Sequence, residues 1–436
     1  MAHRRLLALA SISLIPAALV LTSALPAQAA AAPHAAPAAS QAVAAQGAAY
    51  LAGQIGASGY IPSSTGGADL GSTAQAVLAL HAAGAGGTKA TAAADYLAHH
   101  AADYLGTAGP STDNPGELAY LILVAVASGQ DPTAYGTPAT DLVSRLEATR
   151  GQDGKPQDAG LFGAADPTYD GAFRQGLALA ALHAAGVTDT AASGWLTTQQ
   201  CADGGWQAYR ANTSVPCDPA DAATFSGEDT NSTAMALQGL VAQGVTPAAD
   251  ALTFLRGLQN SDGGFGYTGG ATDANSTGVV LQALAAAGVD ASTWTKGTAT
   301  PYSALAALQL SCSSSTPGAF DYQGPPANAN LAATLQAVLG AADAAFPIAP
   351  ATLAADAPSE CPSVTATPTA TATTTTAAQA EASPTAAPSS PVTAGEMLPY
   401  TGSSDTWLLT GVGLALLVIG AAALVTGQRR TRAHRG

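Results

Sequence analysis

Aromatic and charged residues are both scarce in this 436-residue chain. Aromatic residues make up 5% and charged residues 10% of the sequence, whereas hydrophobic residues, largely alanine, reach 47%. A core with so few bulky side chains must be built from segments that approach one another closely, and alanine is the strongest helix former. The composition therefore predicts an all-α protein.

Basic residues are scarce as well. The chain has 14 Lys and Arg against 29 Asp and Glu, with a net charge of −15. Residues 30–345 alone contain 8 basic and 24 acidic side chains, which gives −16. An acidic body without a basic stripe argues against nucleic acid and anionic membrane surfaces as partners.

The two ends of the chain have compositions of their own. Residues 1–29 combine a basic start, an apolar run and a small-residue site, which predicts a signal peptide. Residues 30–44 are predicted to be a flexible segment. At the other end, residues 407–427 are apolar enough to span a bilayer and are followed by "QRRTRAHRG", which favours a cytoplasmic tail.

The segment 398–436 resembles the cell-wall sorting signal of Gram-positive surface proteins. It contains Leu398, Pro399, Tyr400, Thr401 and Gly402, then the apolar span and the basic tail. The resemblance implies that a sortase cleaves after Thr401 and attaches it to peptidoglycan, so that the membrane is spanned only transiently. A permanent single-span anchor is the alternative. Residues 346–397 are predicted to be a strap followed by a Thr-, Ala-, Pro- and Ser-rich stalk, and the stalk is predicted to be disordered.

Four cysteines are an even set in a chain predicted to be exported. The simplest of the three possible connectivities pairs Cys201 with Cys217 and Cys312 with Cys361. The first bridge would brace a loop, and the second would tie the strap to the body.

A helix–turn–helix unit repeats six times. Segments that mostly begin at Asp or Asn and end at Gly mark one helix of each unit: 69–84, 114–129, 170–186, 229–244, 273–288 and 327–342. Such residues cap helix starts and ends. A second helix precedes each Gly-rich turn. Six such pairs can close into an inner ring within an outer ring, and an open solenoid is the alternative.

Two of the turns resemble the QW-type repeat of squalene cyclases and protein prenyltransferases. "GWLTTQQCADGGW" (194–206) and "TFLRGLQNSDGGFG" (253–266) share an aromatic residue, Gln, Gly and a second aromatic residue. The resemblance implies an (α/α)6 toroid over residues 45–345. It also implies that Gln199, Trp206, Gln259 and Phe265 brace neighbouring repeats and do not contact a ligand.

The catalytic motifs of that superfamily are missing. The sequence has no Asp-x-Asp-Asp acid, no Cys on the expected inner helices for an Asp/Cys/His zinc set, and no Gly-Cys-Gly-Glu-Gln thioester. His81 and His183 occupy equivalent helix ends, where a His is electrostatically favoured. We therefore expect no catalytic residue, no metal site and no cofactor, although an enzyme that lacks the usual motifs stays an alternative.

Polar residues recur near the starts of the inner helices. This polar ring comprises Asp69, Asn114, Glu117, Asp170, Arg174, Asp229, Asp273 and Asn330. One interpretation is helix capping with solvation, and the other is a ligand-facing mouth. Glu117 and Arg174 could pair or clamp a ligand, and Arg174 with free N–H groups would favour an anionic or carbonyl-bearing part.

Three functions fit these patterns. The first is a surface protein that binds a small apolar or corrinoid-like ligand, because the helical domain of intrinsic factor and transcobalamin has the same fold; their second β-domain has no counterpart here. The second is an isoprenoid-type enzyme. The third is a surface protein that displays its body to a partner and holds no small ligand.

Overall fold

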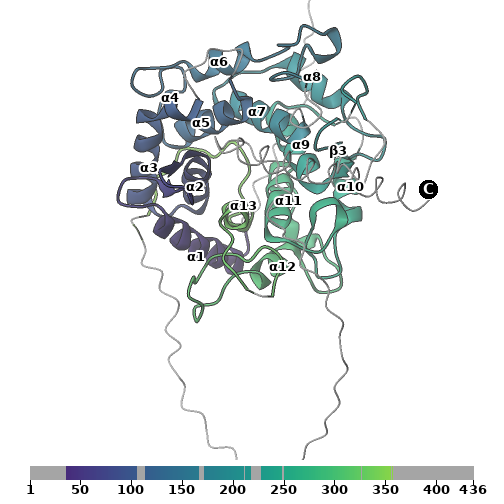
Figure 1. The fold of residues 1–436 in the computed structure, drawn as a ribbon. Helices are drawn as coiled ribbons and strands as arrows, with labels where there is room; N and C mark the ends of the chain where they lie inside the picture. Colours follow the sequence, from purple (N-terminus) through teal and green to yellow (C-terminus); the bar gives the residue numbers. More distant parts are fainter. Residues whose placement is uncertain are drawn as a thin grey trace, which may run out of the picture. The chain divides into compact units, whose positions relative to one another are not determined.

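The structure is a computed structural model that describes residues 36–105, 113–165, 171–210, 212–217, 227–247, 250–325, 327–354 and 356. These ranges are mostly helical, so the predicted all-α class is confirmed (Figure 1). No helix within them is long and apolar enough to cross a bilayer. The predicted signal peptide, the Thr-rich part of the stalk and the sorting signal with its span at 407–427 lie outside the described residues.

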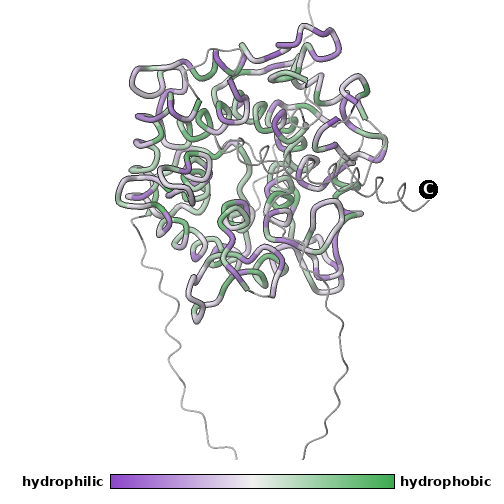
Figure 2. Tube along the Cα trace, viewed as in Figure 1, coloured by the Kyte–Doolittle hydropathy of each residue, from purple (hydrophilic) through white to green (hydrophobic). Residues whose placement is uncertain are grey.

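Six helices are buried along most of their length and are called the core helices here. They are α2 (Leu70–Ala83), α5 (Pro115–Ala127), α7 (Ala172–Ala184), α9 (Thr230–Ala242), α11 (Ala274–Ala286) and α13 (Leu331–Ala341). All six fall within the segments predicted from the capping pattern. Hydrophobic residues dominate them, whereas hydrophilic residues gather in the peripheral loops (Figure 2).

The remaining helices pack beside the core helices with one face exposed. They are α1 (Ala38–Gln54), α3 (Gly87–His99), α4 (Ala101–Leu105), α6 (Leu142–Ala148), α8 (Thr190–Thr198), α10 (Ala251–Leu258) and α12 (Pro301–Ala307). Three 3₁₀ turns accompany them: η1 (Pro156–Asp158), η2 (Tyr267–Gly269) and η3 (Ala291–Thr293). The predicted helix pairs are therefore present.

Contacts link the core helices in chain order. Each contacts the next core helix along the chain, and α13 also contacts α2. The flanking helices lie against neighbouring core helices; α1 contacts both α2 and α13, and α8 contacts both α7 and α9.

Glycines allow two pairs of core helices to approach closely. A Cβ atom at Gly239 of α9 would collide with the backbone of Gly176 in α7, and one at Gly340 of α13 would collide with Gly278 in α11. Because both backbones must come this near, a larger residue at any of these positions would push the helices apart. This is the close approach that the alanine-rich composition predicts.

Each Gly-rich turn is attached to a core helix by a recurring hydrogen bond. A core-helix threonine accepts the N–H of the turn residue in four units: Ile61 to Thr73, Trp206 to Thr233, Phe265 to Thr277, and Phe320 to Thr334, all at 2.9–3.0 Å. In the α7 unit Gln175 Oε1 accepts the N–H of Phe162. These buried backbone N–H groups thereby have hydrogen-bond partners, although the turns belong to no long strand. Two short antiparallel pairs accompany the turns, β1 (Ile61–Pro62) with β2 (Ala68–Asp69) and β3 (Trp206–Gln207) with β4 (Glu228–Asp229).

Trp206 and Phe265 are fully buried, as the structural interpretation of the repeat predicts. Trp206 Nε1 donates to the carbonyl oxygen of Leu196 at 2.8 Å. Gln259 donates from Nε2 to the carbonyl oxygens of Gly263 and Trp294 and so ties two units together.

The predicted role of Gln199 needs correction. In one repeat, Gln259 Nε2 donates to the turn carbonyl of Gly263. In the other repeat the equivalent bond is made by Gln200, whose Nε2 donates to Gly204 O at 2.9 Å. Gln199 Nε2 contacts only Thr198 Oγ1, and its Oε1 has no partner in the described part of the chain. Counting back six residues from Trp206 and from Phe265 reaches Gln200 and Gln259, so the turn fixes the register.

The predicted start of the helical body at residue 45 is too late, whereas the last described helix, α13, ends at Ala341, before the predicted limit at 345. Helix α1 begins at Ala38, inside the segment 30–44 that was expected to be flexible, and the hydroxyl of Ser40 donates to Ala341 O at 2.8 Å. Beyond α13, residues 343–354, called the strap here, return across the body toward α2 and α3 (Figure 1). Phe346 and Ile348 are buried, and Phe346 N–H donates to Gln238 Oε1 of α9.

Candidate functional site

Two buried carboxyl groups stand at the starts of α9 and α11. Asp229 caps α9 by accepting the N–H groups of Asn231 and Ser232 at 2.8 Å each, and Asp273 caps α11 by accepting that of Ser276 at 2.6 Å. Both aspartates are fully excluded from solvent. A carboxyl group in such a position has its hydration replaced by helix N–H donors.

Direct contacts bring these two helix starts together. Asn231 Nδ2 donates to Asn275 Oδ1 at 3.2 Å, and both amides are buried. Asn231 Oδ1 has no hydrogen-bond partner among the described residues. The N–H of Tyr267 donates to Asp273 Oδ2 at 3.3 Å, so the turn that follows Phe265 closes over the start of α11. We call the group formed by Asp229, Asp273, Asn231 and Asn275, with the neighbouring tyrosines, the acidic site.

Three half-buried tyrosines belong to the acidic site. Burial first, and then the nearby carboxyls, raise the pKa of each phenol: Asp229 acts on Tyr209 and Tyr267, and Asp273 acts on Tyr322, whose pKa reaches about 12. The phenols therefore stay protonated at neutral pH and can donate hydrogen bonds.

Burial also shifts the two carboxyls. It raises the pKa of Asp229 and of Asp273 to about 6, against the lowering effect of their hydrogen bonds from Ser232 and Ser276. Carboxyl groups whose pKa is raised toward 7 by desolvation are found at binding and catalytic sites more often than elsewhere. Each can accept hydrogen bonds when ionised and donate one when protonated.

Glu117 and Arg174 do not form an ion pair with each other among the described residues. Glu117 Oε1 instead accepts from Asn114 Nδ2 at 3.4 Å. Burial and then the charge of Asp113 raise the pKa of Glu117 to about 7. Asp113 is held by Arg145, with Nε donating to Oδ2 at 2.9 Å. The guanidinium of Arg174 packs against Gly163, which also faces Pro115 at the start of α5.

The other predicted polar-ring residues act as helix caps. Asp69 accepts the N–H of Ser72, Asn114 that of Gly116, and Asn330 that of Ala333, each at 2.9 Å. All three are half-buried, and no contact joins them to the acidic site. Asp170 lies outside the described residues, and Gly171 occupies the cap position of α7. The capping interpretation therefore accounts for these three, while Asp229 and Asp273 combine capping with a shared buried site.

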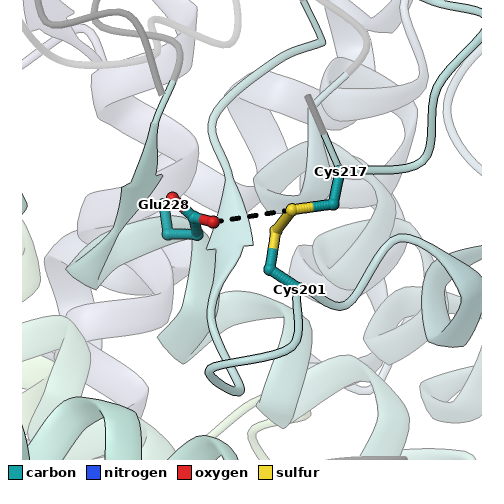
Figure 3. A group of neighbouring side chains, drawn as sticks. All are labelled: Cys201, Cys217 and Glu228. Atoms are coloured by element: carbon teal, nitrogen blue, oxygen red, sulfur yellow. Dashed lines mark hydrogen bonds between the residues drawn. A yellow bond between two sulfur atoms is a disulfide. The ribbon is translucent and has the colours of Figure 1, made fainter. Parts of the chain in front are cut away.

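The predicted disulfide between Cys201 and Cys217 is confirmed, and it lies beside the start of α9 (Figure 3). Glu228 Oε1 is 3.5 Å from Cys217 Sγ, so the bridge holds the loop after β3 next to β4, which leads into Asp229. The three side chains have the composition of a metal-ligand cluster, but the disulfide bond occupies both sulfurs. Cys312 is also disulfide-bonded, and Cys361 lies outside the described residues, so their pairing stays a prediction.

Sequence reasoning missed the tyrosines and the two asparagines of the acidic site. A signal for them exists: the turn motifs "DGGWQAY", "DGGFGY" and "GAFDY" all place a Tyr two or three residues after the buried aromatic residue. The matching starts "DTNST" and "DANST" likewise carry the paired asparagines. Only the contact between α9 and α11 shows that these repeated positions meet.

No protein-family model matches this sequence, and no curated protein is significantly similar to it.

Proposed function

We propose that this chain is a cell-wall-anchored surface protein whose helical body is an (α/α)6 toroid that binds a small ligand at the acidic site. The observation that carries the ligand proposal is the pair of buried carboxyls, Asp229 and Asp273, joined through Asn231 and Asn275 and bordered by tyrosines. Burying charged and polar groups costs free energy that capping alone does not require, since the half-buried Asp69 caps α2 equally well.

The contacts among the core helices support the closed toroid. In an open solenoid the first and last units would each have one uncovered face. Here α13 contacts α2, and Gln309 Nε2 donates to Val43 O of α1 across 266 residues of sequence. The last unit thus makes with the first unit the same kind of glutamine contact that Gln259 makes between adjacent units.

The chemistry of the acidic site favours a ligand that donates hydrogen bonds. Its carboxyl and amide oxygens are acceptors, and buried carboxylates repel an anion. The guanidinium of Arg174 packs against Gly163 near the start of α5, and the hydrogen bonds described for Asp229 and Asp273 come from other residues, so the anionic group expected from sequence fits this site poorly. Amide, hydroxyl or amine groups fit better, and the amides of a corrinoid-like ligand would satisfy this requirement.

Native mass spectrometry of the full-length chain, purified in detergent from its own producer, tests the ligand proposal. We expect a co-purifying molecule that is lost from the Asp229→Asn, Asp273→Asn double variant and kept by Asp69→Asn, a cap variant without the buried neighbour. A chain that carries no molecule and folds normally would favour the display role over ligand binding.

A second candidate, an isoprenoid-type enzyme, is favoured by one specific observation. A buried carboxyl with a pKa of about 6 beside tyrosines has the protonation behaviour of a general acid. Incubating the full-length chain with a linear isoprenoid, with and without Asp229→Asn, distinguishes the two roles. Turnover that disappears in the variant would support an enzymatic role. If the chain leaves the isoprenoid unchanged, ligand binding is the favoured role.

Anchoring rests on the sequence at 398–436 and has its own test. Thr401→Ala should leave the chain in the membrane fraction, because the sortase bond cannot form. The unmodified chain should be released only when the wall is digested. Release of the unmodified chain by detergent alone would overturn the wall attachment and favour a permanent membrane anchor.

A further inference from the structure

A cavity lies at the C-terminal ends of α2 and α5, whereas the acidic site lies at the starts of α9 and α11. Its volume is about 650 Å³, within the range of sites for small molecules. The C-terminal ends of α2 and α5, the outer helix α3 and strap residues 350–353 form its walls. None of these residues belongs to the polar ring, so the cavity is independent of the function proposed above.

Three polar side chains of this cavity each have an atom without a hydrogen-bond partner in the described part of the chain. They are His81 through Nδ1, Ser128 through Oγ and Gln130 through Oε1. Buried polar atoms in native proteins are nearly always paired, and an unpaired one costs about 1–3 kcal/mol. Three residues with such atoms, from α2 and the end of α5, line this one cavity, which favours a polar ligand there.

The lining is hydrogen-bonding and carries little charge. The exposed Thr88 and Thr91 add hydroxyl groups from α3, and Asp95 adds one carboxylate. Within the described ranges no Lys or Arg lines the cavity, and the ammonium group of Lys89 in α3 donates a hydrogen bond to Ile55 O instead. Burial lowers the pKa of His81, which keeps its imidazole neutral at pH 7. The site therefore disfavours anions, and its unpaired polar atoms disfavour a purely apolar ligand.

The strap forms the outer wall of the cavity and is docked by backbone hydrogen bonds. Ala354 N–H donates to Gly84 O at 2.9 Å, and Gly87 N–H donates to Ala354 O at 3.2 Å. A ligand that touches both α3 and strap residues 350–353 would stabilise this docking, because it binds only the docked arrangement fully.

We infer that this cavity is a second binding site, that it takes an uncharged polyhydroxylated ligand such as a saccharide, and that the bound ligand holds the strap against α2 and α3. Hydroxyl groups both donate and accept, which matches His81, Ser128, Gln130 and the two threonines.

Saturation-transfer NMR on the full-length chain in detergent tests the ligand class, with glucose as the probe and inorganic phosphate and methylammonium as comparisons. We expect transfer to glucose alone. Ser128→Ala and Gln130→Ala should each weaken glucose binding by about five- to tenfold, the effect of one hydrogen bond. His183→Leu, at the equivalent exposed position of α7, should leave binding unchanged, whereas His81→Leu should weaken it.

Hydrogen exchange gives the second measurement. Glucose should slow exchange of the Ala354 amide, which is bonded to Gly84 O, and should leave the Asn231 amide at the other helix ends unaffected. No transfer to glucose, binding of phosphate or methylammonium in its place, or glucose binding that Ser128→Ala and Gln130→Ala leave intact would overturn the inference. Because thermal unfolding of each variant is recorded in parallel, a folding defect is recognised separately.

Discussion

Two sides of the core-helix set are packed differently. On the side of α7, α9, α11 and α13, glycines of neighbouring helices face one another: Gly176 faces Gly239, and Gly278 faces Gly340. On the side of α2 and α5, the centre of α5 is a run of bulky aliphatic residues, 121–124, all buried. Distances between helix axes follow the size of the side chains at the contact.

This difference separates the two candidate sites. On the glycine-packed side α9 and α11 are in contact, and the hydrogen bond between Asn231 and Asn275 joins the helix starts that Asp229 and Asp273 cap. The α2–α5 side, whose C-terminal helix ends face α3 and the strap, has the cavity of about 650 Å³. The first side therefore holds a desolvated acidic site, and the second holds a cavity whose lining carries little charge.

The largest expected effect comes from removing the buried aromatic ring of a turn on the glycine-packed side. Trp206→Ala should lower the free energy of unfolding by about 3–5 kcal/mol, because a fully buried ring and its bond to Leu196 O are lost. Ile61→Ala, the equivalent turn position beside α2, removes less volume and should cost less. Denaturant titration measures both. An equal or larger loss at Ile61 would contradict the idea that the Trp206 turn braces the tighter side.

Removing the buried carboxyls should change the pH dependence of stability. Their folded pKa of about 6 lies above the ordinary 3.8, so stability is unaffected below about pH 4 and falls as pH rises toward 6, by roughly 3 kcal/mol per carboxyl. Asp229→Asn and Asp273→Asn keep a good capping residue and should abolish that fall. Asp69→Asn, at a half-buried cap, should relieve much less desolvation. Unfolding curves recorded between pH 4 and 8 test this prediction. If the free energy of unfolding depends on pH in the same way for the unmodified chain and the double variant, the desolvation described is excluded.

Glycine substitutions test the close packing directly. Gly239→Ala should cost about 1–3 kcal/mol, because the added methyl group meets the Gly176 backbone. Gly257→Ala in α10, where an added Cβ meets nothing, should instead stabilise by about 0.5–1 kcal/mol through helix propensity. Thermal unfolding of both variants gives the comparison, and a neutral Gly239→Ala would show that α7 and α9 can separate without cost.

The smallest effect concerns the two adjacent glutamines. Gln200→Leu should lose about 1 kcal/mol with its bond to Gly204 O, whereas Gln199→Leu should be nearly neutral, because it replaces a buried amide whose Oε1 has no partner in the described chain. Paired chemical denaturation measures the difference. The reverse order would restore Gln199 to the bracing role expected from the sequence.

Local signals in the sequence were sufficient for the helices. Asp or Asn at the start and Gly at the end placed five of the six core helices, since caps depend on residues within one turn, and the similar segment 327–342 placed the sixth. The burial of Trp206 and the Cys201–Cys217 bridge followed from patterns of the same short range. The limit at 45 failed because Ser40, in a segment expected to be flexible, is fixed by Ala341, which is distant in sequence.

The sequence by itself determined the all-α class and the six helix pairs, because capping and helix propensity act between near neighbours. Only the tertiary structure decided that Asp229 and Asp273 share one buried site, and that His81, Ser128 and Gln130 line a cavity closed by the strap. Burial, and with it the shift of a carboxyl pKa or the unpaired state of a polar atom, depends on which distant segments exclude water from a side chain.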